Sequence, residues 1–143
     1  MITINVNHAK PSPGKAIIRK WMANSSETLS NYDVKGHLAL ISKEVKVYGV
    51  PEHEVIAYND WAAQVEHEFN NKLIQTVEFR GDHIRVEKSG DIIFTTLEVI
   101  TASDGQVINN ALEVVLKKEN DGVWRVIQER ILDEAESRHL GLI

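Results

Sequence analysis

The chain has 143 residues, 43% of them hydrophobic, which predicts a single globular domain large enough to bury a core. It contains no cysteine, which excludes disulfides and thiolate metal sites and fits the cytoplasm, where we expect the protein to be. Its 16 basic and 21 acidic residues give a net charge of −5, which argues against nucleic acid or an anionic membrane as partner, and no apolar run approaches the roughly 20 residues that span a bilayer.

The N-terminal part of the chain predicts two helices after a mobile lead at residues 1–12. Ser12-Pro13 has the pattern of an N-cap followed by proline at the first helical position. Apolar residues at spacings of three and four then predict a helix over residues 14–30. A second helix is expected over residues 34–42, with Asp33 as its N-cap.

A short hairpin and a third helix follow. Residues 44–50 alternate apolar and polar side chains and predict a strand, which Pro51 ends. Residues 54–58 resume a short strand, and residues 60–72 form the strongest helical pattern in the chain, with Asn59 or Asp60 as its cap.

The remaining chain changes from helical periodicity to alternation, which predicts four long strands. The expected strands are residues 73–88, 91–102, 106–119 and 123–132, separated by turns at Ser89-Gly90, Asp104-Gly105 and Asp121-Gly122. Short connections make neighbouring strands antiparallel, and Gly81 inside the first long strand indicates a bulge.

The predicted fold class is therefore α+β, with helices packed on a strongly curved, mainly antiparallel sheet. The order is two helices, two strands, a helix and four strands. The domain is expected to span residues 13–132, with residues 133–143 as a C-terminal tail. Helices that close one side of such a sheet leave a cavity between the two layers.

The last strand has no cleanly apolar side. Simple alternation places Trp124 and Val126 on one side together with Gln128 and Arg130. A core does not accommodate unpaired polar groups, whereas a cavity can. We therefore predict that Gln128 and Arg130 point towards the cavity; the alternative is that they pair with neighbouring strands at the rim of the sheet.

The element order, the stretch "VYGVP…EVIAYNDW" and the closing "DGVWRVIQER" resemble the nuclear transport factor 2-like superfamily, and most of all its SnoaL-like branch of small bacterial proteins. The resemblance covers about residues 13–132. It implies a cystatin-like cone with a mostly apolar pocket, no cofactor, and often a homodimer formed through the convex face. On that basis the opposite side of the last strand, with Val123, Ile127 and Ile131, would meet the partner.

The resemblance leaves the activity open, because this fold hosts isomerases, cyclases, dehydratases, hydrolases and non-catalytic dimerisation modules. The family's ketosteroid isomerases use an aspartate at the end of the first strand, where this chain has Tyr48-Gly49-Val50. The Arg80-Gly81-Asp82 stretch matches a short pattern of the family's epoxide hydrolases, but it lies one hairpin too early, and we interpret it as chance.

Glu68 is the best candidate for catalysis. It lies on nearly the same helical stripe as Trp61, with Gln64 beside it, so its pKa should be raised and it could act as a general acid or base. The alternative is a structural pair with a base such as Arg130.

The other candidate pocket residues are aromatic: Trp21, Tyr48, Tyr58, Trp61 and Trp124. Core packing explains the tryptophans equally well. The spacing of the histidines does not predict a metal site. We interpret His37 as a histidine of the core.

Two acidic residues of the long strands stay ambiguous. Glu98 and Glu113 could each face the cavity or pair with a base across the sheet. A two-residue loop at the last turn would place Glu113 opposite Arg130, and a three-residue loop would place Leu112 there.

The sequence thus supports two functions. The first is binding of a small apolar or mixed-polarity molecule, oriented by Gln128 and Arg130, with Glu68 for proton transfer in an isomerisation, cyclisation, dehydration or hydrolysis. The second is a non-catalytic homodimerisation or interaction module.

Overall fold

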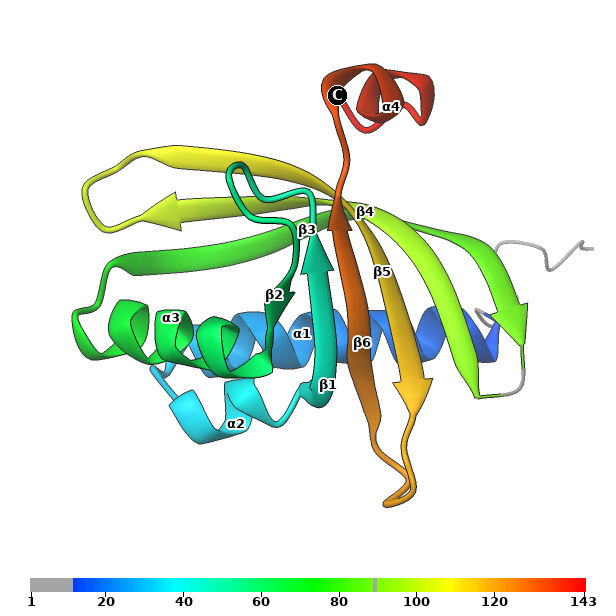
Figure 1. Cartoon of the computed structure of the whole chain (residues 1–143), viewed down its shortest axis with the longest axis horizontal. Coiled ribbons are helices and arrows are strands. Elements are labelled where there is room, and N and C mark those ends of the chain that lie inside the picture. Colours follow the sequence, from blue (N-terminus) through cyan, green and yellow to red (C-terminus); the bar gives the residue numbers. More distant parts are fainter. Residues whose placement is uncertain (1–11, 89) are drawn as a thin grey trace, which may run out of the picture.

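The structure is a computed structural model that describes residues 12–88 and 90–143; the predicted N-terminal lead, apart from Ser12, and the serine of the first turn lie outside this part. Six strands form one curved sheet in the order β2-β1-β6-β5-β4-β3, and the helices α1, α2 and α3 lie against one face of it (Figure 1). The predicted α+β cone is confirmed.

The bounds of the elements follow the predicted order. They are α1 (Pro13–Ser30), α2 (Val34–Leu38), β1 (Ile41–Tyr48), β2 (Ile56–Ala57), α3 (Tyr58–Asn70), β3 (Ile74–Lys88), β4 (Asp91–Ala102), β5 (Val107–Lys118), β6 (Trp124–Ile131) and α4 (Glu134–His139). The last of these is a short helix within the segment predicted as a tail.

The helix caps are partly as predicted. The Ser12 side chain accepts a hydrogen bond from the backbone N–H of Lys15, and the Asp33 side chain accepts one from Gly36. The second helix is shorter than expected, because Ile41 already pairs with Val126 of β6 as the start of β1. The third helix begins earlier, at Tyr58, without a side-chain cap.

The sheet is mixed, because β1 runs parallel to β6 while all other neighbours are antiparallel. The register between β3 and β4 shifts between Arg80 and His83, and Gly81 has a φ of 88°, which confirms the predicted bulge. Such bulges bend a long strand and help this sheet to curve around the helices.

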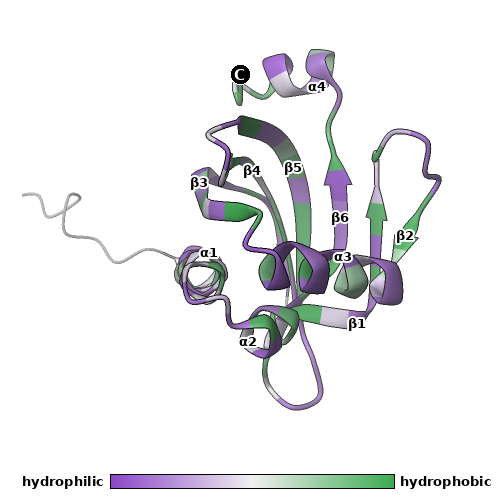
Figure 2. Cartoon of the chain, turned by 90° about the vertical axis from the view of Figure 1, so that its left-hand side faces the viewer, coloured by the Kyte–Doolittle hydropathy of each residue, from purple (hydrophilic) through white to green (hydrophobic). Residues whose placement is uncertain are grey.

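The main core lies between α1 and the concave face of the sheet. Ile18, Phe94 and Val114 are fully buried there, and Trp21 is 7% exposed. A second cluster joins the end of α1, the inner face of α3 and β3 through Leu29, Phe69 and Val77. Figure 2 shows the helices lying across the open side of the curved sheet. No helix within residues 12–88 and 90–143 is long and apolar enough to cross a bilayer.

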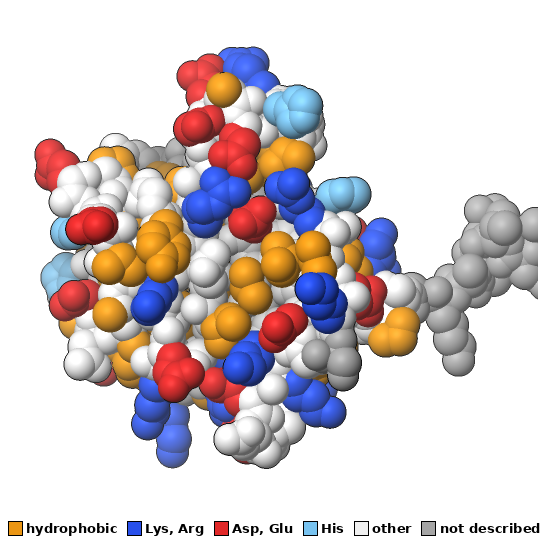
Figure 3. Space-filling model, turned by 45° about the vertical axis from the view of Figure 1, so that its right-hand side comes forward, with side chains coloured by type: hydrophobic (Ala, Val, Ile, Leu, Met, Phe, Trp, Pro, Cys, Tyr) orange, Lys and Arg blue, Asp and Glu red, His pale blue; other side chains and the backbone are white. Residues whose placement is uncertain are grey.

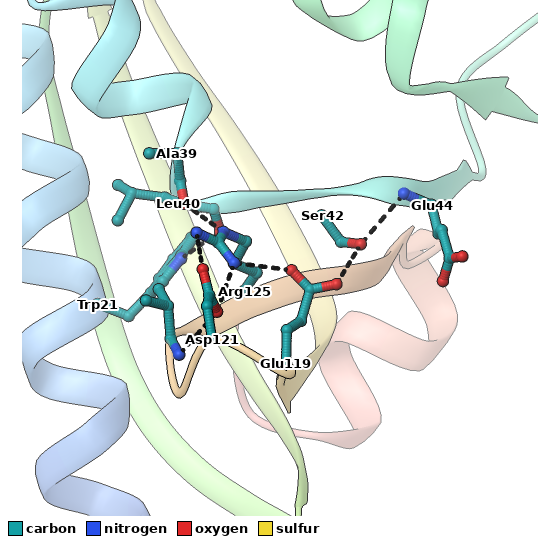
Figure 4. Close-up of polar contacts among 9 residues, drawn as sticks. Trp21, Ala39, Leu40, Ser42, Glu44, Glu119, Asp121 and Arg125 are labelled. Carbon is teal, nitrogen blue, oxygen red and sulfur yellow. Dashed lines mark hydrogen bonds and ion pairs between the residues drawn. The ribbon is translucent and has the colours of Figure 1, made fainter.

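Arg125 fixes the turn of the last hairpin to the segment that leads into β1. Its guanidinium donates to the Ala39 carbonyl at 2.8 Å and forms ion pairs with Glu119 at 3.1 Å and Asp121 at 2.9 Å (Figure 4). Ser42 donates to the other oxygen of Glu119 at 2.8 Å. These contacts fix the start of β6 next to the start of β1.

Candidate active site

The candidate site is a cavity of about 170 Å³ between the helices and the concave face of the sheet. Its wall is mostly apolar, with polar groups at a few positions. The lining residues are Trp21, Ser25, Leu29, His37, Leu40, Ile41, Trp61, Val65, Glu68, Phe69, Ile74, Val77, Glu98, Ile100 and Glu129.

The helical wall is aromatic and rigid. The His37 ring stacks on Trp61 with 6.1 Å between centroids and lies 5.0 Å from the ring of Phe69. Its Nδ1 lies 2.8 Å from the Thr28 hydroxyl, and burial lowers the pKa of His37 to about 4. His37 is therefore neutral at physiological pH. The Trp21 indole N–H donates to the Leu40 carbonyl at 3.2 Å, so this ring presents an apolar surface.

Three carboxyl groups enter the cavity from different elements: Glu68 from α3, Glu98 from β4 and Glu129 from β6. Burial raises the pKa of all three. For Glu129 the pKa rises to about 8, because protein surrounds the side chain and the charge of Glu98 opposes its ionisation. The charge of Glu68 likewise raises the pKa of Glu98. At neutral pH the Glu98–Glu129 pair therefore retains a proton.

The two buried acids differ in their partners. Asn110 donates a hydrogen bond of 3.3 Å to Glu98 from the neighbouring strand. Within the part of the chain that the structure describes, no side chain donates a hydrogen bond to the Glu129 carboxyl. Glu129 is thus a half-buried acid in the cavity wall without a hydrogen-bond donor among these residues.

A β-bulge places Glu129 there. Val126 pairs with Leu116, but Gln128 pairs with Val115, so β6 has one extra residue at Ile127. An extra residue reverses the alternation of all side chains that follow. Val126 keeps the predicted inward direction, whereas the inward positions beyond the bulge are Glu129 and Ile131.

The prediction that Gln128 and Arg130 share the inner side with Trp124 is therefore wrong. The Arg130 guanidinium is on the outer side, where it binds Glu136 of α4 at 3.0 and 2.9 Å and lies 3.4 Å from Glu113. The bulge also settles the predicted alternatives for the register. The loop closes over three residues, as the Glu119–Val123 hydrogen bond shows, yet Glu113 is opposite Arg130 because the bulge shifts the register by one.

The other predicted site residues divide into two groups. Trp21, Trp61 and Glu68 line the cavity, and the pKa of Glu68 is raised by burial as expected. The remainder do not line it: Tyr48 pairs with Arg130 in the ladder between β1 and β6, Tyr58 borders a groove outside, Gln64 is exposed, and Trp124 packs partly buried against the main core.

Arg80-Gly81-Asp82 also lies away from the cavity, since Asp82 pairs with Arg19 of α1 at 2.8 Å.

Sequence reasoning missed Glu129 and undervalued Glu98. Alternation along β4 does place Glu98 with Phe94 on the inner side, so its signal was present in the sequence. For Glu129 the only signal was the polar run at the end of an apolar strand, which does not reveal where a bulge lies.

A larger hollow of about 980 Å³ lies outside the cone, between α2 and the last hairpin. It is an open groove, and its acids Glu119 and Asp121 already pair with Arg125 (Figure 4). Lysines such as Lys43 and Lys117 balance the rest of its charge. The small cavity is the better site, because three carboxyl groups with raised pKa values line it and no described base pairs with them.

The chemistry available in the cavity is proton transfer. Two neighbouring carboxyl groups that together retain one proton offer both an acid and a base in one cavity. No group of three or more acidic or histidine side chains suited to hold a metal ion occurs among residues 12–88 and 90–143.

Comparison with known families agrees with this architecture. Residues 18–131 match the model of the SnoaL-like domain. The chain belongs to the SnoaL-like family. No curated protein matches its sequence.

Solved structures of the same fold share little sequence with this SnoaL-like chain. A candidate scytalone dehydratase from Novosphingobium aromaticivorans is 10% identical, with a TM-score of 0.66 over 81% of this chain and 80% of that one. A candidate dehydratase of the nuclear transport factor 2-like family from Streptomyces avermitilis is 13% identical, with a TM-score of 0.61 over 85% and 96%. A Nostoc punctiforme protein with a cystatin-like fold is 13% identical, with a TM-score of 0.64 over 87% and 95%.

Proposed function

We propose that this SnoaL-like protein binds a small, largely apolar molecule in the cone cavity and catalyses a cofactor-free proton transfer on it, of the isomerisation or dehydration type. The Glu98–Glu129 pair carries this proposal. Ionisable groups with strongly shifted pKa values cluster at functional sites, and this pair lines a cavity without a basic partner among the described residues.

The pair can act as base and acid in turn. The ionised carboxylate removes a proton from a carbon of the ligand, and the protonated carboxyl donates its proton to an oxygen. In a dehydration that oxygen leaves as water, and the electrons of the broken C–H bond form the new double bond. Glu68 borders the same space and is a second candidate for the proton donor.

The two dehydratase candidates among the solved structures support this reaction class by analogy of fold. They share 10% and 13% identity with this chain, so the argument depends on the carboxyl pair itself.

An assembly role is the second candidate, favoured by the outer face of the sheet. Hydrophobic side chains gather on this face below α4, with charged side chains around them (Figure 3). Val86 and Val123 are 36% and 40% exposed, whereas Ile131, which we expected on this face, packs against the core. A homodimer formed through this face is compatible with catalysis in the cavity. With either function, we expect the protein to be in the cytoplasm.

The first experiment is native mass spectrometry of gently purified protein, which reports the mass of the assembly and of any retained molecule. We expect a dimer carrying a small organic molecule. A bare protein that no small apolar compound stabilises against heat would contradict the binding proposal and leave the assembly role.

Proton transfer is then tested on the retained molecule in D2O. The wild type is expected to exchange a carbon-bound proton for deuterium, and Glu129→Gln to slow this by roughly 10²–10⁴-fold. Glu78→Gln, the same change at an exposed position of β3, should match the wild type. Equal exchange in Glu129→Gln and the wild type would remove the catalytic role.

A further inference from the structure

We propose that the ligand is a small organic amine, bound as its ammonium ion at Glu98 and Glu129 with its apolar part against Trp21 and Trp61. This inference rests on the proposed small-molecule function of the cavity and names the class of ligand. A bound ammonium group takes the place of the proton on the Glu98–Glu129 pair, so the proton donor of the proposed reaction is then Glu68, which borders the same space.

The charge of the cavity lining favours a cationic ligand. Its lining contains three carboxyl groups and a neutral histidine, but no lysine or arginine among the residues that the structure describes. Arg130, which we expected to orient the ligand, is held outside by Glu113 and Glu136. A carboxylate or phosphate ligand would therefore meet only acids, whereas a cation would meet complementary charge.

The carboxyl groups of Glu98 and Glu129 need hydrogen-bond donors. The Glu129 carboxyl has no donor from the described residues, and Glu98 has only the 3.3 Å contact from Asn110. An ammonium group carries up to three donors and no acceptor. Hydrogen bonds between an ammonium group and carboxylates are charge-assisted and therefore strong in an enclosed site. An amine thus supplies what both acids lack.

The aromatic wall suits the rest of the amine. Aromatic side chains offer a large apolar surface for its ring or alkyl part, and their faces also attract a nearby cation. Trp21, Trp61 and Phe69 all line the cavity. His37 stacks on Trp61 and stays uncharged, since burial lowers its pKa to about 4, so it does not repel a cation.

The size of the cavity limits the ligand. A cavity of about 150 Å³ accommodates benzene, so 170 Å³ suits an amine with one ring or a short branched chain.

Amine binding should depend on pH in a defined way. Entry of a cation displaces the proton that the carboxyl pair holds, so affinity should rise between pH 6 and 8. Two further titratable groups face the pair, Glu68 from α3 and His37 from α2. Among residues 12–88 and 90–143, the other elements contribute no titratable side chain to the lining. Their lining residues are Trp21, Ser25 and Leu29 from α1, Leu40 just before β1, Ile41 of β1, and Ile74 and Val77 from β3.

The test uses three probes of nearly equal shape on the full chain: benzylamine, benzyl alcohol and benzoate. Isothermal titration at pH 7.5 should show benzylamine binding at least tenfold more tightly than benzyl alcohol, and benzoate not binding. Glu129→Gln should lower the affinity for benzylamine at least tenfold, and Glu78→Gln should leave it unchanged. If Glu129→Gln does not fold, Glu98→Gln replaces it.

The pH series provides a test on the wild type alone. Affinity for benzylamine should rise from pH 6 to pH 8, while that for benzyl alcohol stays flat. Tighter binding of benzyl alcohol or benzoate, or an unchanged affinity in Glu129→Gln, would overturn the amine class and leave the pocket function intact. Absence of binding by all three probes would also overturn the amine inference, while the proposed function is judged separately from the molecule retained by the purified protein.

Discussion

Glu129 and Arg130 are neighbours on β6, yet they belong to two regions that treat charge in opposite ways. Inside the cone, Glu98 and Glu129 have no basic partner among the described residues, and a retained proton lowers the charge of the pair. On the outer face, Glu113 and Glu136 are neutralised by Arg130, and Arg85 lies 3.3 Å from Glu113. The ion pair between Arg130 and Glu136 holds α4 onto the sheet, whereas the only side-chain donor to the two inner acids among the described residues is Asn110, to Glu98.

This difference indicates which region is functional. Ion pairs on the outside are ordinary surface stabilisation. A buried acid without a base lowers stability once it ionises, and sites of that kind are typical of catalysis and binding.

Replacement of Glu129 by glutamine should stabilise the protein at alkaline pH. The pKa of Glu129 is about 8 in the folded chain against an ordinary 4.5, so the folded state holds the extra proton and loses stability as pH rises through that interval. Glutamine cannot ionise. Between pH 5 and pH 8 the free energy of unfolding of Glu129→Gln should gain on the order of 2–4 kcal/mol relative to wild type, measured by urea denaturation. If the difference in free energy of unfolding between Glu129→Gln and the wild type were the same at pH 5 and pH 8, Glu129 would have the pKa of an ordinary glutamate.

The pKa of His37 should make stability depend on pH in the opposite direction, with a loss of stability at acid pH. Its pKa is about 4 when folded and 6.5 when not, so the neutral ring contributes stability that is present above pH 6.5 and lost as pH falls towards 4. Between pH 7 and pH 4.5, the free energy of unfolding of His37→Asn should therefore fall by about 2–3 kcal/mol less than that of the wild type. The exposed His83→Asn serves as control, and an equal acid loss in wild type and His37→Asn would contradict the assignment.

Loss of Arg130 should have a smaller and local effect. Its side chain is 34% exposed, so Arg130→Ala should cost only about 1 kcal/mol of global stability. Without the bond to Glu136, α4 should exchange its amide hydrogens faster, while binding in the cavity is unchanged. Arg138→Ala, which removes an exposed pair with Glu134, should affect neither, and reduced ligand binding in Arg130→Ala would restore the role that alternation predicted.

The sequence was sufficient for the fold because local signals agreed with one another. The Ser12 cap, the Gly81 bulge, the turn glycines and the switch from helical to alternating periodicity each depend on nearby residues. The helical periodicity of α1 and α3 likewise predicted that Trp21 and Trp61 face inward, and both line the cavity.

The site could not be predicted fully because it depends on one residue of register. The bulge at Ile127 follows no glycine and arises where β6 meets β5 on one side and the parallel β1 on the other. A shift of one residue exchanges the inner and outer sides, so the prediction selected Gln128 and Arg130 in place of Glu129. The charge of the cavity, and with it the expected ligand, changed sign.

The most direct test of the account is a titration of the glutamate side-chain carboxyl carbons by NMR, with assignments from Glu129→Gln and Glu136→Gln. The account predicts that Glu129 titrates near pH 8, because burial and Glu98 oppose its ionisation, while Glu136 titrates below the ordinary range, because Arg130 holds its pKa down. If Glu129 instead titrated in the ordinary range of an exposed glutamate, the cavity would not contain a protonated acid pair, and the proposed site would be contradicted.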